Sequence, residues 1–321
     1  MKKFNYMDEV FNRNPIYRSY SPAKQKWIKF KFLLSRTFKN TALIDYVQYN
    51  FFLLNGDGRD RFISQKKRRI IRNKLNNKDK LIIFDDKDRF NKDFSQYIGR
   101  SSLDLAKASQ EEVESFMADK KNIMLKPVEG SFGVGITKIA CDDSGLKKVL
   151  EDYMGKDYII EEYLVQDKEL AEFNDSSFNT LRVLTLIDDK GEPDIIAAVL
   201  RMGRKGKFVD NFHYDGISAL IDHESGVVKT TGTDQYFNRY TFHPDSNKQI
   251  VGFKIPHWDK VIKTVKEAAM IHPDMRYVGW DIGVREDGSV VIIEGNHSGD
   301  PDVIQRTDLV GKWHLFSKYI D

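Results

Sequence analysis

The feature that most constrains this chain is a pair of apolar runs near its end, separated by a short charged turn. Val278–Val284 and Val290–Asn296 flank a segment that contains Asp287 followed by Gly288. An Asp-Gly pair between two apolar runs is a strong signal for a β-hairpin. The sequence therefore predicts two antiparallel strands in this part of the chain.

Three oxygen-bearing side chains interrupt those apolar runs: Asp281, Glu294 and Asn296. Side chains repeat every second residue on a strand, so Glu294 and Asn296 face the same way, and pairing across the turn can bring Asp281 beside them. Carboxylate and amide oxygens suit a hard cation such as Mg²⁺ that is shared with phosphates. The alternative is that the acidic residues simply face water, although surface acids seldom lie inside such apolar runs.

A second motif lies far upstream, where the apolar run Ile123–Leu125 ends in Lys126 and leads into a glycine-rich segment. Gly130, Gly133 and Gly135 let backbone N–H groups approach a phosphate closely and adopt positive φ without steric cost. Lys126 adds a positive charge for the same phosphates. The spacing fits neither the P-loop nor the dinucleotide-binding fingerprint. A glycine-rich hairpin with a structural purpose is the alternative.

The order of these motifs resembles that of the ATP-grasp superfamily. The lysine strand and glycine-rich loop are followed by Tyr158–Leu164, by two strands that carry arginine, and by the Asp…Glu-x-Asn hairpin. Within the superfamily, the chain is similar to the sugar-transfer-associated ATP-grasp proteins of bacterial surface-polysaccharide loci. The segments that carry this resemblance are Asn179–Val183, Leu200–Gly203, Asp210–His213, Ile255–Asp259 and Tyr277–Ile282.

The resemblance implies an α+β fold in which two α+β subdomains sandwich ATP. We expect a basic, mostly helical N-terminal region over residues 1–80 and an ATP-grasp domain over residues 81–321. Residues 103–165 would carry the lysine strand, the glycine-rich loop and the hinge, and residues 166–305 the metal and phosphate groups.

The pattern along the chain also predicts individual elements. Leu81–Phe84 is predicted as a short strand, and the acidic segment that follows it is predicted to open a helix with Asp at its start. Further helices are expected around residues 110–120, 144–154 and 257–271, and strands at 158–164, 181–187 and 195–202.

The resemblance implies roles in ATP binding for the residues that match the motifs of the family. Lys87 and Lys126 match two lysines that family members place on the phosphates. Lys87 could instead be an ordinary solvated lysine at a helix start. The loop that closes over the β and γ phosphates is matched by Ser131, Phe132 and Gly133.

The hinge strand of the family binds adenine through backbone atoms, so its side chains need not matter. The matching residues here are Glu161, Glu162, Tyr163 and Leu164. Glu169 is the candidate for the ribose hydroxyls, because a carboxylate accepts hydrogen bonds from both, and Asp167 is its rival.

Arg182 and Arg201 each lie in a strand of otherwise apolar residues, where a guanidinium group is costly unless it is paired. They could hold phosphate or carboxylate oxygens and stabilise charge as the γ-phosphoryl group moves. The alternative is an ion pair with an inward-facing carboxylate. Asn211 and His213 match a family position near the phosphates, although His213 could equally be a half-buried structural histidine.

The resemblance makes Asp281, Glu294 and Asn296 the metal set, with Glu294 bridging two Mg²⁺ ions, for which Mn²⁺ could substitute. The segment His297–Asp300 differs from the Pro-Gly sequence that the family has after that asparagine. The resemblance therefore does not identify the residues of the acceptor site.

The function implied is that of an ATP- and Mg²⁺-dependent ligase that joins a carboxylate to an amine through an acyl phosphate. Its substrate would be a bacterial surface-polysaccharide precursor that receives an amino acid or a similar group. One alternative is a kinase of the same superfamily that phosphorylates a sugar or another hydroxyl. Another is a nucleotide-binding adaptor in a polysaccharide-assembly complex.

Composition agrees with such an enzyme. Hydrophobic residues make up 40% of the chain and charged residues 31%, which are globular values. No apolar run approaches the roughly 20 residues needed to span a bilayer, and the N-terminus lacks the apolar core of a signal peptide. Cys141 is the single cysteine, which excludes an intramolecular disulfide. We expect a cytoplasmic protein, or one that is peripheral at the inner membrane face.

The first 80 residues hold 20 basic residues against 6 acidic ones. Within them, Ser21 followed by Pro22 is a reasonable helix start, and the segment that follows mixes lysines with Trp27, Phe30 and Phe32. Helical spacing places Trp27 and Phe30 together and Phe32 to the side. Such a helix could lie on an anionic membrane through residues 1–40, or pack its apolar stripe on the protein. Nucleic acid is a third option, but no nucleic-acid motif accompanies the basic residues.

Overall fold

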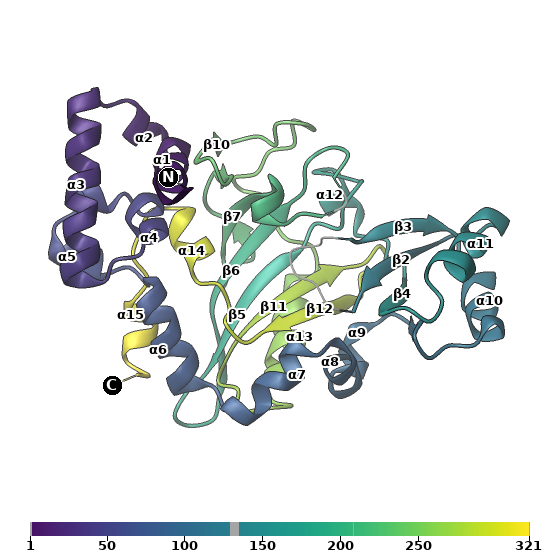
Figure 1. Ribbon diagram of the computed structural model, residues 1–321. Coiled ribbons are helices and arrows are strands. Elements are labelled where there is room, and N and C mark those ends of the chain that lie inside the picture. The colour runs from purple at the N-terminus through teal and green to yellow at the C-terminus, as the bar shows by residue number, and fades with distance from the viewer. Residues whose placement is uncertain (1, 129–134, 208, 321) are drawn as a thin grey trace.

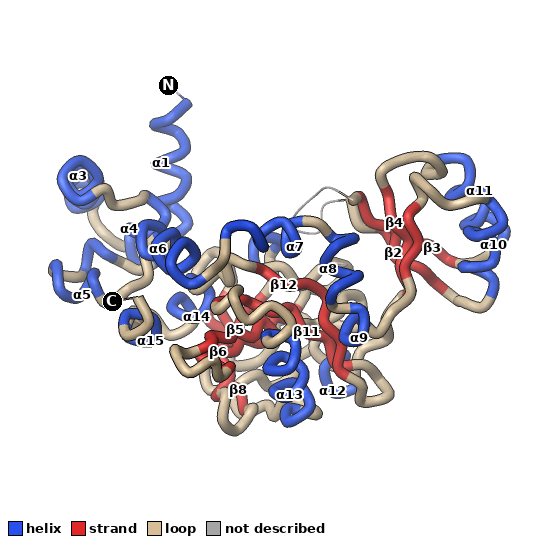
Figure 2. The backbone as a smooth tube through the Cα atoms, turned by 90° about the horizontal axis from the view of Figure 1, so that it is seen from below, coloured by secondary structure: helices blue, strands red, loops and turns tan. Residues whose placement is uncertain are grey.

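The computed structural model describes residues 2–128, 135–207 and 209–320. The molecule is elongated, with helices of the N-terminal region at one end, a large sheet in the middle and a smaller sheet at the other end (Figure 1). Figure 2 shows the same three parts from below. The predicted glycine-rich loop residues Ser131, Phe132 and Gly133 lie outside the described residues.

The N-terminal region is helical, as predicted, and has an apolar core of its own. The aromatic side chains of Phe11, Tyr17, Phe32 and Tyr46 are fully buried in it. Ser21 caps the longest helix and Pro22 begins it. The helices are α1 (Lys2–Arg13), α2 (Pro15–Arg18), α3 (Pro22–Lys39), α4 (Leu43–Gln48), η1 (Phe51–Leu53), α5 (Gly56–Asp60) and α6 (Gln65–Leu75). Among the described residues, no helix is long and apolar enough to cross a lipid bilayer.

The smaller sheet has four antiparallel strands in the order β1-β4-β2-β3. Two helices cover one of its faces, because Val113 and Val149 pack on Ile123, Leu125 and Ile160 of the strands. The elements are β1 (Ser102–Asp104), α10 (Gln110–Ala118), β2 (Asn122–Pro127), β3 (Thr137–Ala140), α11 (Asp143–Asp152) and β4 (Tyr158–Glu162).

The larger sheet runs in the order β10-β9-β7-β6-β5-β11-β12, and β8 pairs with β7. Every residue of β5 and β11 is buried, which identifies them as central strands covered on both faces. The strands are β5 (Leu181–Ile187), β6 (Pro193–Met202), β7 (Ile217–Asp222), β8 (Val227–Val228), β9 (Gly232–Thr233), β10 (Arg239–Tyr240), β11 (Tyr277–Val284) and β12 (Val290–Asn296).

Helices from distant parts of the chain cover the two faces of this sheet. On one face lies α13 (Trp258–Ala269), whose Val261 and Val265 belong to the same core as Trp280. On the other face, α6 packs together with α14 (Asp302–Arg306) and α15 (His314–Ser317). The remaining short helices are η2 (Lys78–Lys80), α8 (Lys87–Asp93), α9 (Ser95–Ile98), α12 (Lys168–Ala171) and η3 (Phe212–Tyr214).

One predicted element is wrong. Leu81–Phe84 is not a strand but the greater part of helix α7 (Leu81–Asp85), in which the ring of Phe84 packs near Phe90 and Trp280. Four consecutive apolar residues fit a short strand and a single helical turn equally well, so the sequence pattern alone could not decide. The helix after it, α8, begins with an Asp cap from Asp86 as expected. The other predicted helices and strands are present, with ends that differ by a few residues.

Candidate functional site between the two sheets

The cleft between the two sheets contains two adjoining cavities. One, of about 190 Å³, lies against the hinge after β4, and the other, of about 750 Å³, extends over the ends of β11 and β12. Lys126, Arg201 and Glu294 line both cavities, so together they form one continuous cleft. Most of the predicted site residues that the structure describes lie along it.

On the small-sheet side, Glu161 is the centre of a buried ion cluster. Its carboxylate accepts a hydrogen bond from Lys126 Nζ and two from the guanidinium of Arg100, at 2.9 and 3.3 Å. Burial alone would raise the pKa of Glu161, but the charges of Lys126 and Arg100 outweigh it and hold that pKa at about 2. The lysine predicted to meet phosphates is therefore positioned by a carboxylate on the neighbouring strand.

Arg100 also joins the two sheets. Its guanidinium donates to the carbonyl of Ile292 at 3.0 Å and to that of Ile293 at 3.1 Å, both on β12. The arginine is 61 residues from Glu161 and 192 from Ile292 in sequence. Sequence reasoning missed both Arg100 and the role of the Glu161 side chain.

The hinge that follows β4 exposes backbone groups to the smaller cavity. Tyr163 and Leu164 line it, and in the described chain no backbone hydrogen bond engages their amides or carbonyls. Met124 and Phe178 add apolar surface to the same cavity. A flat, partly apolar ring with polar edges, such as a purine, suits these walls.

On the large-sheet side, charged residues form a row across neighbouring strands. Asp281 on β11 lies opposite Arg182 on β5 and opposite Glu294 on β12. Arg182 holds both oxygens of Asp281, with Nη2 to Oδ2 at 3.0 Å, and Arg201 on β6 donates to the same Oδ2 at 3.0 Å. The hairpin and its cross-strand neighbours therefore form as predicted. The ion pair that was an alternative for the two arginines is present.

The two carboxyl groups in this row are paired unequally, because both arginines bind Asp281. Although Asp281 is buried, the neighbouring guanidinium groups hold its pKa below its usual range. The side chain of Glu294 is exposed at the cleft, but neighbouring protein atoms replace part of the water around its carboxyl group. This loss of hydration, together with the charge of Asp281, raises the pKa of Glu294 to about 7. Two carboxyl groups in hydrogen-bonding contact thus share a site that a proton or a cation can stabilise.

These residues fit a divalent cation in part. Glu294 and Asp281 provide hard oxygen ligands whose mutual repulsion a cation would relieve. The side-chain oxygen of Asn296 already accepts hydrogen bonds from the amides of Ser298 and Gly299, at 3.0 and 3.2 Å, so it shapes the following turn. Among the described residues, no cluster of three or more His, Cys, Asp or Glu side chains forms a complete metal cage. Phosphate oxygens or water would have to complete such a site.

The other predicted residues occupy different positions relative to the cleft. Lys87 is half-buried at the cleft, donates to the carbonyl of Pro127 at 2.9 Å, and has its pKa lowered by burial and by the nearby charge of Lys126. Asn211 lines both cavities. The side chain of His213 lies outside the described residues.

The remaining predicted residues are the hinge residue Glu162 and the two candidates for the ribose contact, Glu169 and Asp167. Glu162 lines the smaller cavity and lies 3.6 Å from Arg285. Glu169 is exposed on the first turn of α12, and Asp167 caps that helix. Neither lines the cleft cavities, so the structure gives no support to a ribose contact from either.

A lysine strand facing a carboxylate hairpin across a cleft, with a hinge between two α+β layers, is the arrangement of an ATP-grasp protein. Residues 65–318 match the family described as sugar-transfer associated ATP-grasp. The chain belongs to this family, which confirms the predicted superfamily, its α+β fold and the ATP-grasp class of enzyme. No curated protein matches the chain in sequence.

Several solved structures are similar to this chain. D-cycloserine synthetase DcsG is 10% identical, with 77% of this chain and 74% of that chain covered and a TM-score of 0.48. The ATP-grasp ligase PsnB complexed with a minimal precursor is 14% identical, with 75% and 62% covered and a TM-score of 0.46. The D-alanine-D-alanine ligase from Coxiella burnetii is 10% identical, with 74% and 56% covered and a TM-score of 0.44. This chain spans 53% to 62% of the length of the PsnB chains that it matches.

Proposed function

We propose that this protein is an ATP- and Mg²⁺-dependent ligase that joins a carboxylate to an amine, with a bacterial surface-polysaccharide precursor as its acceptor. The observation that carries the proposal is the pair of unequal carboxyl groups, Asp281 and Glu294, facing Lys126 across one cleft. The polysaccharide precursor is suggested by the family, which is associated with sugar transfer.

The chemistry has two steps. An oxygen of the acceptor carboxylate forms a bond to the γ-phosphorus of ATP while the bond to the β-phosphate oxygen breaks, giving an acyl phosphate and ADP. An amine then forms the C–N bond, phosphate leaves with the former carboxylate oxygen, and the amine nitrogen loses a proton. Little covalent work falls to the protein, so positioning and electrostatics carry the catalysis.

Different residues of the cleft would bind the phosphates, the adenine and the metal ion. Lys126, held by Glu161, and the half-buried Lys87 would neutralise phosphate oxygens from one side. Tyr163 and Leu164 would bind adenine through their backbone groups. Asp281 and Glu294 would hold Mg²⁺, which when bound offsets charge on the phosphates.

A product screen tests the proposal. ATP, Mg²⁺ and pairs of amino acids with uronic-acid or amino-sugar acceptors would be incubated with the protein, and the products identified by mass spectrometry. An amide condensation with release of ADP and phosphate is the expected result. A stable phosphoester would instead identify the kinase alternative, and ATP binding without any product would identify the adaptor.

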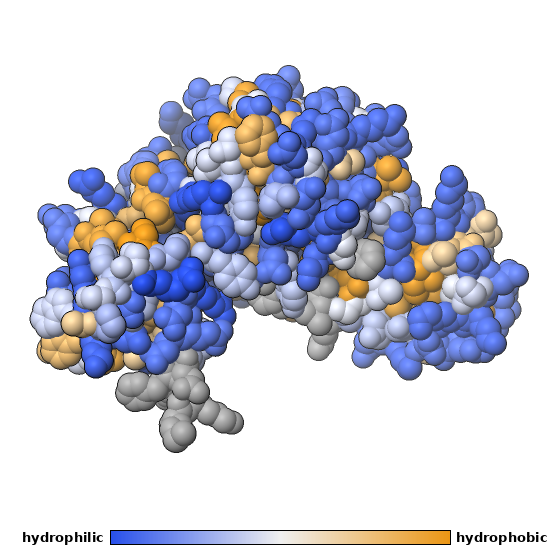
Figure 3. Space-filling model, turned by 90° about the horizontal axis from the view of Figure 1, so that it is seen from above, coloured by the Kyte–Doolittle hydropathy of each residue, from blue (hydrophilic) through white to orange (hydrophobic). Residues whose placement is uncertain are grey.

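We also propose that the outer face of α3 contacts an anionic membrane surface. Trp27, Phe30, Leu34 and Phe38 recur at helical spacing and are 53%, 48%, 41% and 80% exposed. The rings of Trp27 and Phe30 stack at 5.5 Å, whereas Phe32 is buried on the opposite side. Apolar side chains lie among hydrophilic ones at the N-terminal end of the molecule, at the left of Figure 3.

Vesicle sedimentation tests this contact. Full-length protein should sediment in part with vesicles of phosphatidylglycerol and phosphatidylcholine at low salt, and rising ionic strength should release it. Replacing Trp27, Phe30 and Phe38 with Ser should abolish sedimentation. Replacing Phe242, Met270 and Val310, three exposed apolar residues elsewhere, with Ser is the matched control. Equal sedimentation of the two variants would rule the contact out.

A further inference from the structure

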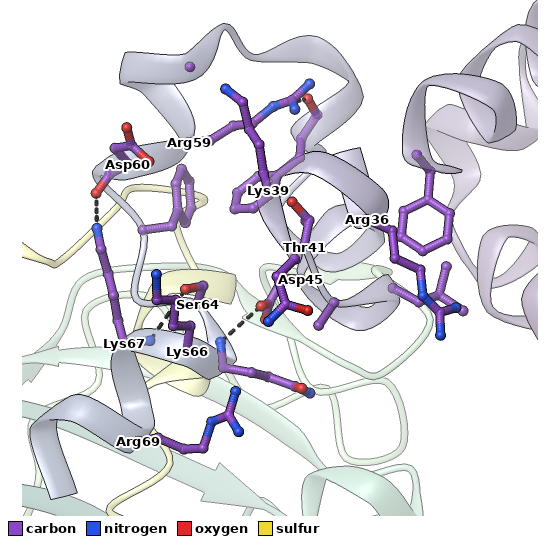
Figure 4. A pocket seen from close by; sticks show the side chains of 18 of the residues that line it. Arg36, Lys39, Thr41, Asp45, Arg59, Asp60, Ser64, Lys66, Lys67 and Arg69 are labelled. Carbon is purple, nitrogen blue, oxygen red and sulfur yellow. Dashed lines mark hydrogen bonds between the residues drawn. The ribbon is translucent and has the colours of Figure 1, made fainter. Parts of the chain in front are cut away.

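A third cavity, of about 790 Å³, lies away from the nucleotide cleft, between the N-terminal helices and α6 (Figure 4). Its walls come from α1, α3, α5 and α6, and Trp313 closes one side. The volume lies within the range of about 300–1,000 Å³ that is typical of small-molecule sites. Nothing in the proposed ligase reaction so far uses it.

Basic side chains dominate the polar lining of this cavity. Asp45 and Asp60 are the acidic side chains there, and Asp45 accepts a hydrogen bond from the amide of Gln65 at 2.9 Å, in the first turn of α6. The six basic residues are Arg36, Lys39, Arg59, Lys66, Lys67 and Arg69. In the described part of the chain, none of the six forms an ion pair with a carboxylate. The cavity thus carries a surplus of positive charge that an anion would neutralise.

The same cavity also has apolar walls. Leu33, Leu43, Ile70 and Trp313 line it together with the basic groups, and the ammonium of Lys67 lies 4.4 Å from the centre of the Trp313 ring. Figure 4 shows the basic side chains arriving from α3, α5 and α6, on different sides of the space. A ligand that suits these walls carries both negative charge and an apolar part.

A path of arginines connects this cavity to the nucleotide cleft. A smaller hollow of about 360 Å³ shares Gln65 and Arg69 with the cavity, and it shares Arg68 and Ser298 with the cleft. Arg72 lines the hollow as well. From Gln65 to Arg72, the stretch of α6 that lines the hollow rises about 10 Å, which is about the length of a diphosphate with one sugar.

The arginines along this path differ in whether they form ion pairs with carboxylates. Arg68 is bound by Asp300 and lies 3.6 Å from Asp302, so it fixes the loop that follows the carboxylate hairpin. Arg69 is exposed, Arg72 is half-buried, and neither forms an ion pair among the described residues. A guanidinium group binds phosphate through paired N–H donors, which makes Arg69 and Arg72 suited to a phosphorylated ligand.

We propose that this cavity and the arginine face of α6 bind the phosphate-bearing part of the acceptor substrate, whose reactive end reaches the cleft at Ser298. The inference rests on the proposed ligase function and names its acceptor class: a sugar phosphate or diphosphate that also carries a partly apolar group. That group is either a nucleoside or a lipid chain, and the experiment distinguishes the two.

Calorimetry on the full-length protein, with its cleft filled by ADP and Mg²⁺, tests the proposal. The probes are UDP-glucose and dihexanoyl phosphatidic acid below its micelle concentration, with dihexanoyl phosphatidylcholine as the uncharged-headgroup control. One phosphate probe should bind with a stoichiometry of one and lose affinity as salt rises. Binding of UDP-glucose identifies a nucleotide-linked acceptor, and binding of the phosphatidic acid a lipid-linked one. Failure of both probes to bind at 1 mM would overturn the proposal.

Two pairs of substitutions locate the binding. Arg69→Gln with Arg72→Gln, on α6, and Arg36→Gln with Lys39→Gln, on the opposite wall, should each weaken the probe at least tenfold. Lys147→Gln with Lys148→Gln on α11 removes the same charge from an exposed helix and should change affinity less than twofold. An effect no larger than that of the α11 pair would contradict the site.

The same preparations separate this inference from the ligase itself. ADP affinity should be unchanged in every variant, which also shows that the fold is intact. Probe binding without any ligase product would leave the cavity as a phosphate site and refute the catalytic proposal alone. Ligase product with an acceptor that lacks phosphate, formed equally well by the α6 variant, would refute the cavity alone.

Discussion

Each of the two sheets contributes an ion cluster to the cleft, and the clusters differ in how their carboxyl groups are paired. In the smaller sheet, Glu161 meets two cations and its pKa falls to about 2. In the larger sheet, Asp281 also meets two cations, but Glu294 lies beside it with a pKa raised to about 7. In the first cluster the carboxylate is held by two cations, whereas in the second Glu294 forms no ion pair among the described residues.

This difference separates a structural cluster from a binding site. A carboxylate with sufficient cationic partners stabilises the arrangement of its strands and needs no ligand. A carboxyl group held half-protonated near neutral pH retains an affinity for added positive charge. The variants that follow test the distinction, from the largest expected effect to the smallest.

Asp281→Asn should have the largest effect. Arg182 would lose the carboxylate that it contacts closely and would retain a 3.4 Å hydrogen bond to the carbonyl of Gly299 and a longer, 3.8 Å pair with Asp300, so a buried charge would remain with weak compensation. We expect the free energy of unfolding in urea to fall by about 3–5 kcal/mol. Asp189→Asn, which breaks an exposed pair with Arg276, should cost less than about 1 kcal/mol. Equal losses in the two variants would show that the Asp281 cluster does not stabilise the fold.

Glu294→Gln should reduce Mg²⁺-dependent turnover of ATP about 100-fold or more, because the ligand that accepts the cation is lost. The fold should persist, since no ion pair depends on this side chain among the described residues. Glu286→Gln, at an exposed acid of the same hairpin, is the control. Undiminished turnover in Glu294→Gln would remove the metal assignment.

The raised pKa of Glu294 should also affect how the free energy of unfolding depends on pH. The folded protein keeps this proton up to about pH 7, whereas the unfolded chain releases it near its ordinary value of 4.5. Glu294 should therefore make the free energy of unfolding fall as pH rises between those values, and Glu294→Gln should lack that component. A difference curve between wild type and variant that is flat from pH 4.5 to 7 would contradict the shift.

Glu161→Gln should destabilise the protein less than Asp281→Asn does, by about 1–3 kcal/mol. Arg100 would keep its hydrogen bonds to the carbonyls of Ile98, Ile292 and Ile293, and the partly exposed Lys126 could turn to solvent. Urea unfolding measures the loss. A cost equal to that of Asp281→Asn would show that the backbone carbonyls do not support Arg100.

Lys126→Ala should have the smallest of these effects, raising the Kd for ATP about tenfold, or about 1.4 kcal/mol. The lysine supplies one charge to the phosphates, while Lys87 lines the same cavity and can supply another. Isothermal calorimetry measures the change, and Lys147→Ala on α11 should leave ATP affinity unaltered. An unchanged affinity in Lys126→Ala would remove its phosphate role.

The large-sheet cluster was predictable from sequence because its signal is local. Asp281, Arg182 and Arg201 each stand out as a charged residue within an apolar strand, and the hairpin turn fixes the pairing of Asp281 with Glu294. Glu161 carries the same signal, since it follows two apolar residues of β4. The resemblance assigns the hinge contacts to backbone atoms, so it predicts no role for the Glu161 side chain.

Arg100 could not be predicted in this way. It lies outside any apolar strand, directly after Gly99, and its partners are 61 and 192 residues away. Only the packing of the two sheets brings them together. The helix α7 was missed for a different reason, because a four-residue apolar run has no period from which helix and strand can be distinguished.

The position of Arg100 bears on how the cleft opens. It is hydrogen-bonded at once to β4 and to β12, so it joins the two sheets beside the hinge end of the cleft. A second contact, the 2.9 Å hydrogen bond from Lys87 Nζ to the carbonyl of Pro127, joins the same two parts where Lys87 lines the larger cavity. Arg100 donates four hydrogen bonds to Glu161 and to the carbonyls of Ile292 and Ile293, whereas Lys87 donates one, so we expect the cleft to open first at the Lys87 end.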